Sequence, residues 1–154
     1  MESGFSRPES SVATVASDWR QSVPVLTSRV LSVREVTPKD ASPLLAMLGT
    51  RDVSRFLSPH PPTADAFVRF VTWTHQQRAA GQYVCFAVVP AGMSTPIGLF
   101  QVRSLEPRFS TAEWGFALGS PFWGTGLFIE GAKLVVDFAF ETIGVHRLEA
   151  RASV

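Results

Sequence analysis

Two glycines separated by one residue, Gly124 and Gly126, stand between an apolar stretch and a long segment with helical spacing. A glycine turn at the start of a helix lets consecutive backbone N–H groups converge on one point. The unpaired donors and the dipole of the first helical turn favour negative charge there. Glycine also permits unusual φ angles and a close approach to a ligand, because it has no Cβ atom. The spacing predicts an anion site that suits a phosphate or pyrophosphate.

The residue types that most often ligate metals or act as nucleophiles are few and scattered. Cys85 lies in an apolar stretch with no activating partner nearby in sequence, which is typical of a packed, inert thiol. His60, His75 and His146 lack metal-ligand spacing, so no metal site is predicted. His60 stands in a proline-rich loop at 58–62 that could lie beside a substrate, although loop histidines are usually only solvated.

Hydrophobic periodicity predicts an alternation of strands and helices around the glycine turn. Strands are expected at 29–36, 83–89, 96–102, 111–118 and 146–154, and helices at 37–49, 64–80 and 127–142. The strands at 83–89 and 96–102 are separated by a short turn and should pair antiparallel. The sequence therefore predicts an α+β fold with one strand, turn and helix forming the ligand site.

The predicted helix after the glycine turn is apolar on most of its surface. Its charged residues form one narrow stripe, which consists of Glu130, Lys133, Asp137 and Glu141. A helix of this kind must lie against a sheet.

Composition limits the possible classes of protein. The chain has 154 residues, of which 45% are hydrophobic, and this is enough for one domain with a substantial core. Residues 1–23 are expected to form a loosely ordered tail and residues 24–154 the domain. A formal net charge of +1 disfavours a nucleic-acid partner. A single cysteine, no apolar run that could span a bilayer and no secretory signal favour a cytoplasmic location.

Several short motifs occur in a recognisable order along the chain. They are Pro24-Val25-Leu26, Val33-Arg34, Pro38-Lys39-Asp40-Ala41, Glu113-Trp114-Gly115-Phe116, Phe122-Trp123-Gly124-Thr125-Gly126, Glu130 and Gly144-Val145-His146-Arg147-Leu148-Glu149-Ala150-Arg151. In this order the chain resembles the GNAT N-acetyltransferase superfamily, specifically its Rim-type branch of ribosomal-protein N-terminal acetyltransferases. The resemblance implies a mixed, mainly antiparallel twisted sheet with flanking helices. Family members continue through a further helix and two strands, so the domain is expected to be incomplete at its C-terminal end.

The resemblance implies that acetyl-CoA is the acetyl donor. Its pyrophosphate would sit on backbone N–H groups of the turn, and the residues concerned are Trp123, Gly124, Thr125, Gly126, Leu127 and Phe128. Thr125 could add a hydroxyl donor. The pantetheine arm and thioester would lie along the preceding strand at Phe116, Ala117 and Leu118, where the N–H of Phe116 or Leu118 would face the thioester oxygen.

Glu113 is the predicted general base, because a reacting amine must lose a proton and the family often has a carboxylate at this position. A surface or salt-bridged glutamate is an equally weighted reading of the same residue. Glu130 is interpreted as structural, since its place in the first helical turn suits the helix dipole. Phe128 stands where the family has Ala or Gly, so its ring either crowds the site or turns toward the core.

The predicted function is acetyl transfer to a primary amine, foremost a protein N-terminal α-amine. A small-molecule amine is the nearest alternative, and the choice would depend on loops such as 57–63. A non-catalytic acyl-CoA-binding or partner-completed module is an alternative of another class. An exposed edge on the last strand would also permit a homo-oligomer. The simplest alternative is an α+β domain in which the glycine turn is only a tight connection.

Overall fold

The computed structural model describes residues 18–50 and 63–150, and their strands form one sheet. The sheet has six strands in chain order, β1 (Leu26–Thr27), β2 (Leu31–Glu35), β3 (Tyr83–Pro90), β4 (Gly98–Ser104), β5 (Thr111–Leu118) and β6 (Arg147–Ala150). Neighbouring strands are antiparallel except for β5 and β6, which run parallel. The prediction of a mixed, mainly antiparallel sheet is therefore confirmed.

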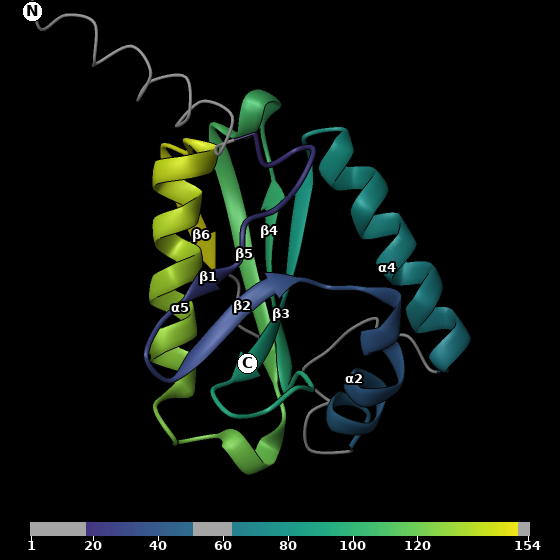
Figure 1. Cartoon of the computed structure of the whole chain (residues 1–154). Helices are drawn as coiled ribbons and strands as arrows, with labels where there is room; N and C mark the ends of the chain where they lie inside the picture. The colour runs from purple at the N-terminus through teal and green to yellow at the C-terminus, as the bar shows by residue number, and fades with distance from the viewer. Residues whose placement is uncertain (1–17, 51–62, 151–154) are drawn as a thin grey trace, which may run out of the picture.

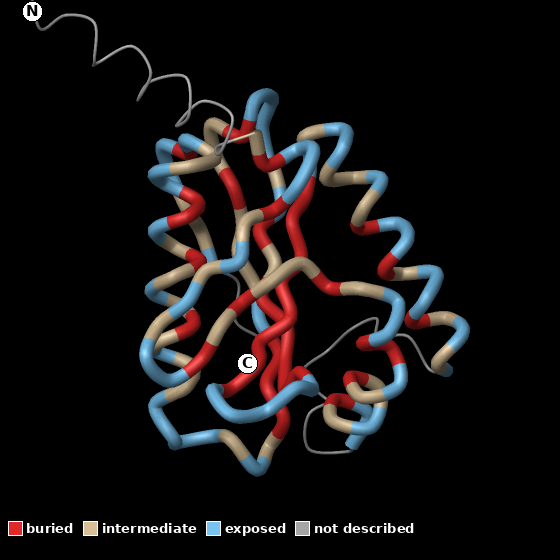
Figure 2. The backbone as a smooth tube through the Cα atoms, in the orientation of Figure 1, coloured by how far each residue is buried: buried red, intermediate tan, exposed pale blue. Residues whose placement is uncertain are grey.

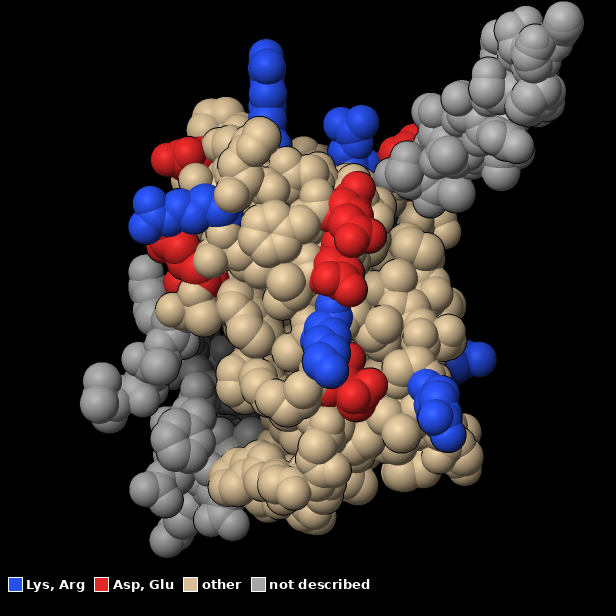
Figure 3. Space-filling model, turned by 90° about the vertical axis from the view of Figure 1, so that its left-hand side faces the viewer, with Lys and Arg blue, Asp and Glu red and all other residues tan. Residues whose placement is uncertain are grey.

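Helices cover both faces of the sheet (Figure 1). The helix α5 (Leu127–Phe138) lies on one face, and α2 (Ala41–Leu48) and α4 (Ala64–Ala79) lie on the other. Figure 3 shows a narrow column of charged side chains on the molecular surface beside α5, surrounded by uncharged residues. No helix in the described part of the chain has the length and apolar character needed to cross a membrane.

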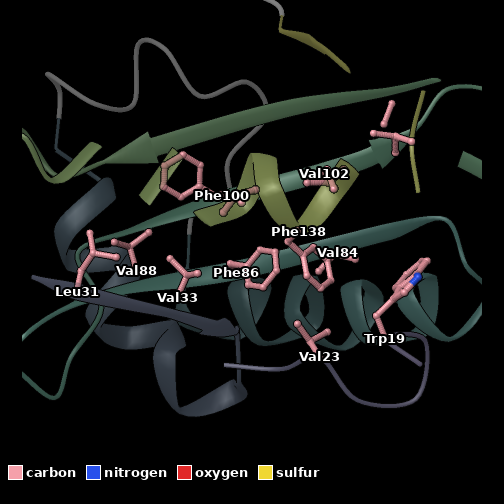
Figure 4. Packing of buried hydrophobic residues seen from close by; sticks show 14 of the residues in the cluster. Trp19, Val23, Leu31, Val33, Val84, Phe86, Val88, Phe100, Val102 and Phe138 are labelled. Carbon is pink, nitrogen blue, oxygen red and sulfur yellow. The ribbon is translucent and has the colours of Figure 1, made fainter. Parts of the chain in front are cut away.

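Two hydrophobic clusters fill the space between the sheet and its helices. The cluster beneath α5 joins Phe86 of β3 to Phe138, whose rings meet edge to face with centroids 5.2 Å apart (Figure 4). The cluster beneath α2 and α4 contains Leu44, Phe67 and Cys85. Every residue of β3 is buried (Figure 2), and its apolar sequence shows no alternation because helices cover both of its faces.

The connection from β2 to α2 is organised around one buried carboxylate. Asp40 accepts hydrogen bonds from both terminal nitrogens of Arg34, at 2.8 and 2.9 Å, and from the backbone N–H of Thr37 at 2.8 Å. Burial alone would raise the pKa of Asp40, but the bonds from Arg34 and Thr37 outweigh it and lower the pKa below its usual value. The predicted helix start at Thr37 and Pro38 begins as a short 3₁₀ turn, and the helix ends before Gly49 as expected.

Three features differ from the sequence-based expectations. Strand β1 was not predicted, because two residues are too few to show a pattern. The helix predicted at 127–142 is α-helical only to Phe138 and continues as one π-helical turn over Ala139–Ile143. Within the predicted tail, Trp19 and Val23 are buried in the core, and the Trp19 ring meets Phe109 edge to face at 5.5 Å. Residues 18–23 thus belong to the domain, and residues 1–17 lie outside the described residues.

Candidate functional site

The glycine turn has the backbone geometry that its sequence predicts. Gly124 and Gly126 have φ angles of 75° and 87°, in the left-handed region that other residues rarely adopt. A Cβ atom built on either glycine would meet no described atom within 4 Å. The turn therefore has open space above it, and the glycines are needed for the backbone conformation and not for packing within the protein.

Backbone donors gather beside this open space. Within the described residues, the N–H groups of Gly124, Thr125, Gly126 and Phe128 have no hydrogen-bond partner. The first backbone bond of α5 runs from the Glu130 N–H to the carbonyl of Gly126, at 3.3 Å. Unpaired backbone donors and the positive end of the helix dipole both favour an anion at this turn.

Three of the predicted donors are used within the turn itself. The Trp123 N–H donates to the Ser120 carbonyl at 3.1 Å, and the Thr125 hydroxyl donates to the Phe122 carbonyl at 2.6 Å. The Leu127 N–H makes a long bond of 3.4 Å to the Thr125 hydroxyl oxygen. Thr125 therefore stabilises the turn in this structure, and its hydroxyl proton would have to leave Phe122 to reach a ligand.

The indole of Trp123 connects the turn to the end of β5. Its Nε1 donates to the Leu118 carbonyl at 2.8 Å, while 48% of the residue remains exposed. This bond places the glycine turn directly beyond the last residue of the strand.

The ring of Phe128 turns toward the sheet and away from the glycines. Its centroid lies 4.4 Å from Phe116, 5.9 Å from Phe100 and 6.1 Å from Trp114. The sequence left two expectations for the Phe128 ring, that it crowds the site or that it turns toward the core. The structure shows the second, with the ring packed against β4 and β5. The backbone donors at the start of α5 consequently remain accessible.

The backbone of β5 alternates between its two neighbouring strands. Gly119 donates to Ile97 and Thr111 accepts from Leu105, at 2.9 and 2.8 Å, so the odd-numbered residues of β5 bond to β4. The N–H groups of Phe116 and Leu118 consequently point to the opposite side, toward β6. The described pairing of β5 with β6 ends at Trp114, opposite Ala150. Phe116 and Leu118 thus lie beyond the last described pair of these strands.

Glu113 lies on the face of the sheet that α4 covers, because it alternates with Trp114, which packs in the cluster beneath α5. Its Oε1 accepts a hydrogen bond from Arg103, its cross-strand partner in β4, at 2.5 Å. The Glu113 side chain is 17% exposed and that of Arg103 is 49% exposed. The structure thus shows the salt bridge, and the role of Glu113 as a general base remains a prediction.

The other singled-out residues lie away from the turn or outside the described residues. Cys85 is fully buried, and burial raises the pKa of its thiol. His75 Nε2 lies 2.7 Å from the Val36 carbonyl. His60 and the loop at 58–62, with most of 57–63, are outside the described residues.

Sequence reasoning missed the polar side chains next to Glu113 on the same sheet face. These are Arg103 and Gln101 of β4 and Tyr83 of β3. Their signal in the sequence is spacing by two, with polar side chains at 101 and 103 on either side of an apolar residue. Only the register of the strands shows which residues they meet.

Comparison with known proteins connects this geometry to a family. The model of the Acetyltransferase (GNAT) domain matches residues 31–154. An uncharacterized N-acetyltransferase, p20 of Bacillus licheniformis, is 23% identical over 122 residues, which cover 79% of this chain and 68% of p20.

Solved structures share the fold at low identity. Mycobacterium smegmatis RimJ in complex with CoA-disulfide superposes with a TM-score of 0.70 at 16% identity, over 88% of this chain and 69% of RimJ. The ribosomal-protein-S5-alanine acetyltransferase of Vibrio fischeri gives a TM-score of 0.72 at 16% identity, over 82% of this chain and 73% of that one. Because the family model covers most of the sequence, the chain belongs to the GNAT family of N-acetyltransferase enzymes.

Proposed function

We propose that this enzyme transfers an acetyl group from acetyl-CoA to a primary amine, and that the amine is the α-amino group of a protein N-terminus. The observation that carries the proposal is the glycine turn, whose unpaired N–H groups open onto free space directly beyond β5. The structural similarity to RimJ and to a ribosomal-protein acetyltransferase supports the choice of acceptor.

The residues of the turn fit the pyrophosphate of CoA. A diphosphate needs several converging donors and a backbone that it can approach closely. The N–H groups of Gly124, Thr125, Gly126 and Phe128 supply the donors, and the absent Cβ atoms leave the approach open. The β5 backbone from Phe116 to Leu118 would hold the pantetheine arm, since the backbone polar groups of Phe116 and Leu118 point away from β4.

When bound, acetyl-CoA supplies an acetyl group activated as a thioester. The N–H of Phe116 or Leu118 would donate to the thioester carbonyl oxygen and stabilise the negative charge that develops on it. As the new C–N bond forms, the C–S bond would break, and the departing CoA thiolate would take up the second proton that the nitrogen loses. Glu113 takes a proton from the acceptor ammonium group, so that the amine is neutral when it reacts. Two residues of β5 lie between Glu113 and Phe116, and the Cα atoms of Glu113 and Phe116 are about 10 Å apart, so a bridging water would carry the proton to the Glu113 carboxylate.

The salt bridge between Glu113 and Arg103 favours a second candidate, a non-catalytic acyl-CoA-binding module. The pairing with Arg103 would account for Glu113 as a structural residue that links β4 to β5, without a catalytic role. A turnover assay distinguishes the two candidates, because a non-catalytic binding module does not transfer the acetyl group.

The first experiment titrates the protein with acetyl-CoA, desulfo-CoA and inorganic phosphate by isothermal calorimetry. Micromolar affinity for both CoA ligands and little affinity for phosphate are expected. Gly126→Trp should abolish CoA binding. Gly92→Trp is the matched control, because Gly92 also has a left-handed φ of 83° and open surroundings but lies in the turn between β3 and β4. Equal CoA affinity in the two variants would contradict the proposed cradle.

A thiol-release assay with peptides that carry a free N-terminus then tests the reaction. Release of CoA thiol that depends on the peptide supports the proposed function. Tight CoA binding with no turnover on any peptide or small amine would leave only the binding module.

A further inference from the structure

Among the described residues, the sheet face beneath α4 has a gap in its layer of side chains at Gly115. A Cβ atom built on Gly115 would meet no described atom within 4 Å, although its φ is not in the left-handed region. Its neighbours on this face are Glu113 and Ala117 along β5 and Gln101 directly opposite on β4. Open space beside the predicted base is therefore present on the α4 side of the sheet.

Gln101 borders this gap with a fixed orientation. Its Oε1 accepts a hydrogen bond from the Tyr83 hydroxyl at 2.5 Å. Tyr83 is only 3% exposed, and the ring of Trp73 packs against it with centroids 4.9 Å apart. Burial raises the pKa of Tyr83, so the phenol keeps its proton and remains a donor.

The other end of the Gln101 amide is available to a ligand. The bond from Tyr83 identifies Oε1 as the acceptor, which leaves Nε2 with two N–H donors. Among the described residues, Nε2 has no hydrogen-bond partner. None of their buried side-chain nitrogen or oxygen atoms lacks a partner, so Nε2 is accessible to solvent. A solvent-accessible amide donor on an immobilised side chain is suited to recognise a carbonyl oxygen.

Glu113 borders the same gap from along the strand. Its carboxylate is oriented by Arg103, with 2.5 Å between the bonded atoms. The Cα atoms of Glu113 and Gly115 are roughly 6.7 Å apart along the strand, and those of Gln101 and Gly115, a hydrogen-bonded pair, are about 5.5 Å apart. An oriented carboxylate and an oriented amide donor thus stand within one residue length of the gap.

We infer that Gln101 is a specificity-determining residue that recognises the first peptide carbonyl of the acceptor, while the acceptor's α-ammonium group faces Glu113 across the gap at Gly115. The inference rests on the proposed function and specifies its substrate class. In a peptide, one carbon separates the α-nitrogen from the first carbonyl, so both groups fit a site one residue wide. A simple alkylamine has the nitrogen but no carbonyl to accept from Gln101.

The test compares two acceptors, a short peptide with a free N-terminus and the alkylamine with the same first side chain but no carbonyl. Gln101→Met retains the length of the side chain and removes its hydrogen bonds. It should lower kcat/KM for the peptide about tenfold, the typical effect of one lost hydrogen bond, and change kcat/KM for the alkylamine less than twofold. Gln76→Met on the exposed side of α4 is the matched control and should change neither value.

A binding measurement gives a second readout that does not depend on turnover. The protein saturated with desulfo-CoA is titrated with the peptide by calorimetry, and Gln101→Met should weaken the peptide about tenfold at unchanged desulfo-CoA affinity. If Gln101→Met fails to fold, Tyr83→Phe frees Oε1 of Gln101 and should reduce the preference for the peptide over the alkylamine.

The outcomes separate this inference from the proposed function. Suppose that the wild-type protein turns over both acceptors. If Gln101→Met then lowers kcat/KM equally for both, or lowers it for neither, the role of Gln101 is overturned and the proposed function is not. CoA binding without turnover of either acceptor by the wild-type protein would overturn the proposed function and this inference with it.

Discussion

Gly131 of α5 lies against the ring of Phe100 in β4, so close that a Cβ on Gly131 would stand 2.7 Å from Cε2 of Phe100. Phe100 is 2% exposed and stacks on Trp114 and Phe128, so its ring has little freedom to move. This contact brings α5 close to the sheet, and it does so one turn after the start of the helix. The glycine turn that begins the helix is thereby held at the end of β5.

We therefore expect Gly131→Ala to destabilise the protein. Alanine gains about 1 kcal/mol of helix propensity over glycine, but overpacking a rigid core costs about 1–3 kcal/mol. The net loss in free energy of unfolding should be about 1 kcal/mol, measured by urea denaturation. Lys133→Ala, on the exposed side of α5, is the control and should change stability by less than about 0.5 kcal/mol. A Gly131→Ala protein as stable as the wild type would show that the Phe100 ring can move aside.

Glu113→Gln should lower turnover and leave CoA binding unchanged. The amide cannot accept the proton of the acceptor ammonium, and loss of a general base typically reduces the rate about 10²–10⁴-fold. The measurement is kcat/KM for a peptide, with CoA affinity determined by calorimetry. Glu141→Gln, in the π-helical turn that follows α5, is a matched control far from the glycine turn in sequence and should keep its rate. Unchanged turnover in Glu113→Gln would contradict the role of Glu113 as a general base and would support a structural role in the salt bridge with Arg103.

Asp40→Asn should destabilise the protein by about 3 kcal/mol at pH 7, because it leaves the partly buried Arg34 without its carboxylate partner. The folded-state pKa of Asp40 lies below its usual value of about 3.9, so its carboxylate contributes fully above that pH. As the pH falls below about 4 and through the folded-state pKa, this contribution is lost. The stability difference between Asp40→Asn and wild type should accordingly shrink in acid.

Urea denaturation from pH 7 down to about pH 2.5 measures this dependence. Asp137→Asn, on the exposed side of α5, should change stability little at any pH. A difference between Asp40→Asn and wild type that stays constant with pH would contradict the role of the Asp40 charge.

Cys85 should resist thiol reagents as long as the protein is folded. Its side chain is fully buried in β3, and burial raises the pKa of the thiol, so little reactive thiolate is present. Labelling with a disulfide reagent at pH 8 should be slow without denaturant and rapid in concentrated urea. Rapid labelling of the native protein would show that β3 opens locally.

The local parts of the site could be predicted because they depend on residues close together in sequence. Gly124 and Gly126 adopt left-handed φ angles. A short turn that leads into a helix needs such angles, and glycine adopts them without steric strain. The strand at 111–118 matches β5, since an apolar run bounded by turn residues shows its length in the sequence. The order of the motifs also identified the family, which the domain match confirms.

The contacts between distant segments could not be predicted in the same way. The direction of the Phe128 ring depends on how α5 sits on β4 and β5, and Gly131 has no signal beyond its small size. Burial of Trp19 depends on the ring of Phe109, ninety residues further along the chain. Such contacts result from packing of the whole core, in which no single segment contains the information.

The sequence by itself determined the strand, the glycine turn and the helix, together with Glu113 as a carboxylate in the strand that leads to the turn. Only the tertiary structure decided that Glu113 meets Arg103, that Tyr83 orients Gln101, and that Gly115 leaves a gap between Glu113 and Gln101. The physical reason is strand register. A shift of one residue between β4 and β5 would send Gln101 and Arg103 to the opposite face of the sheet, and the register is set by burying both hydrophobic clusters at once.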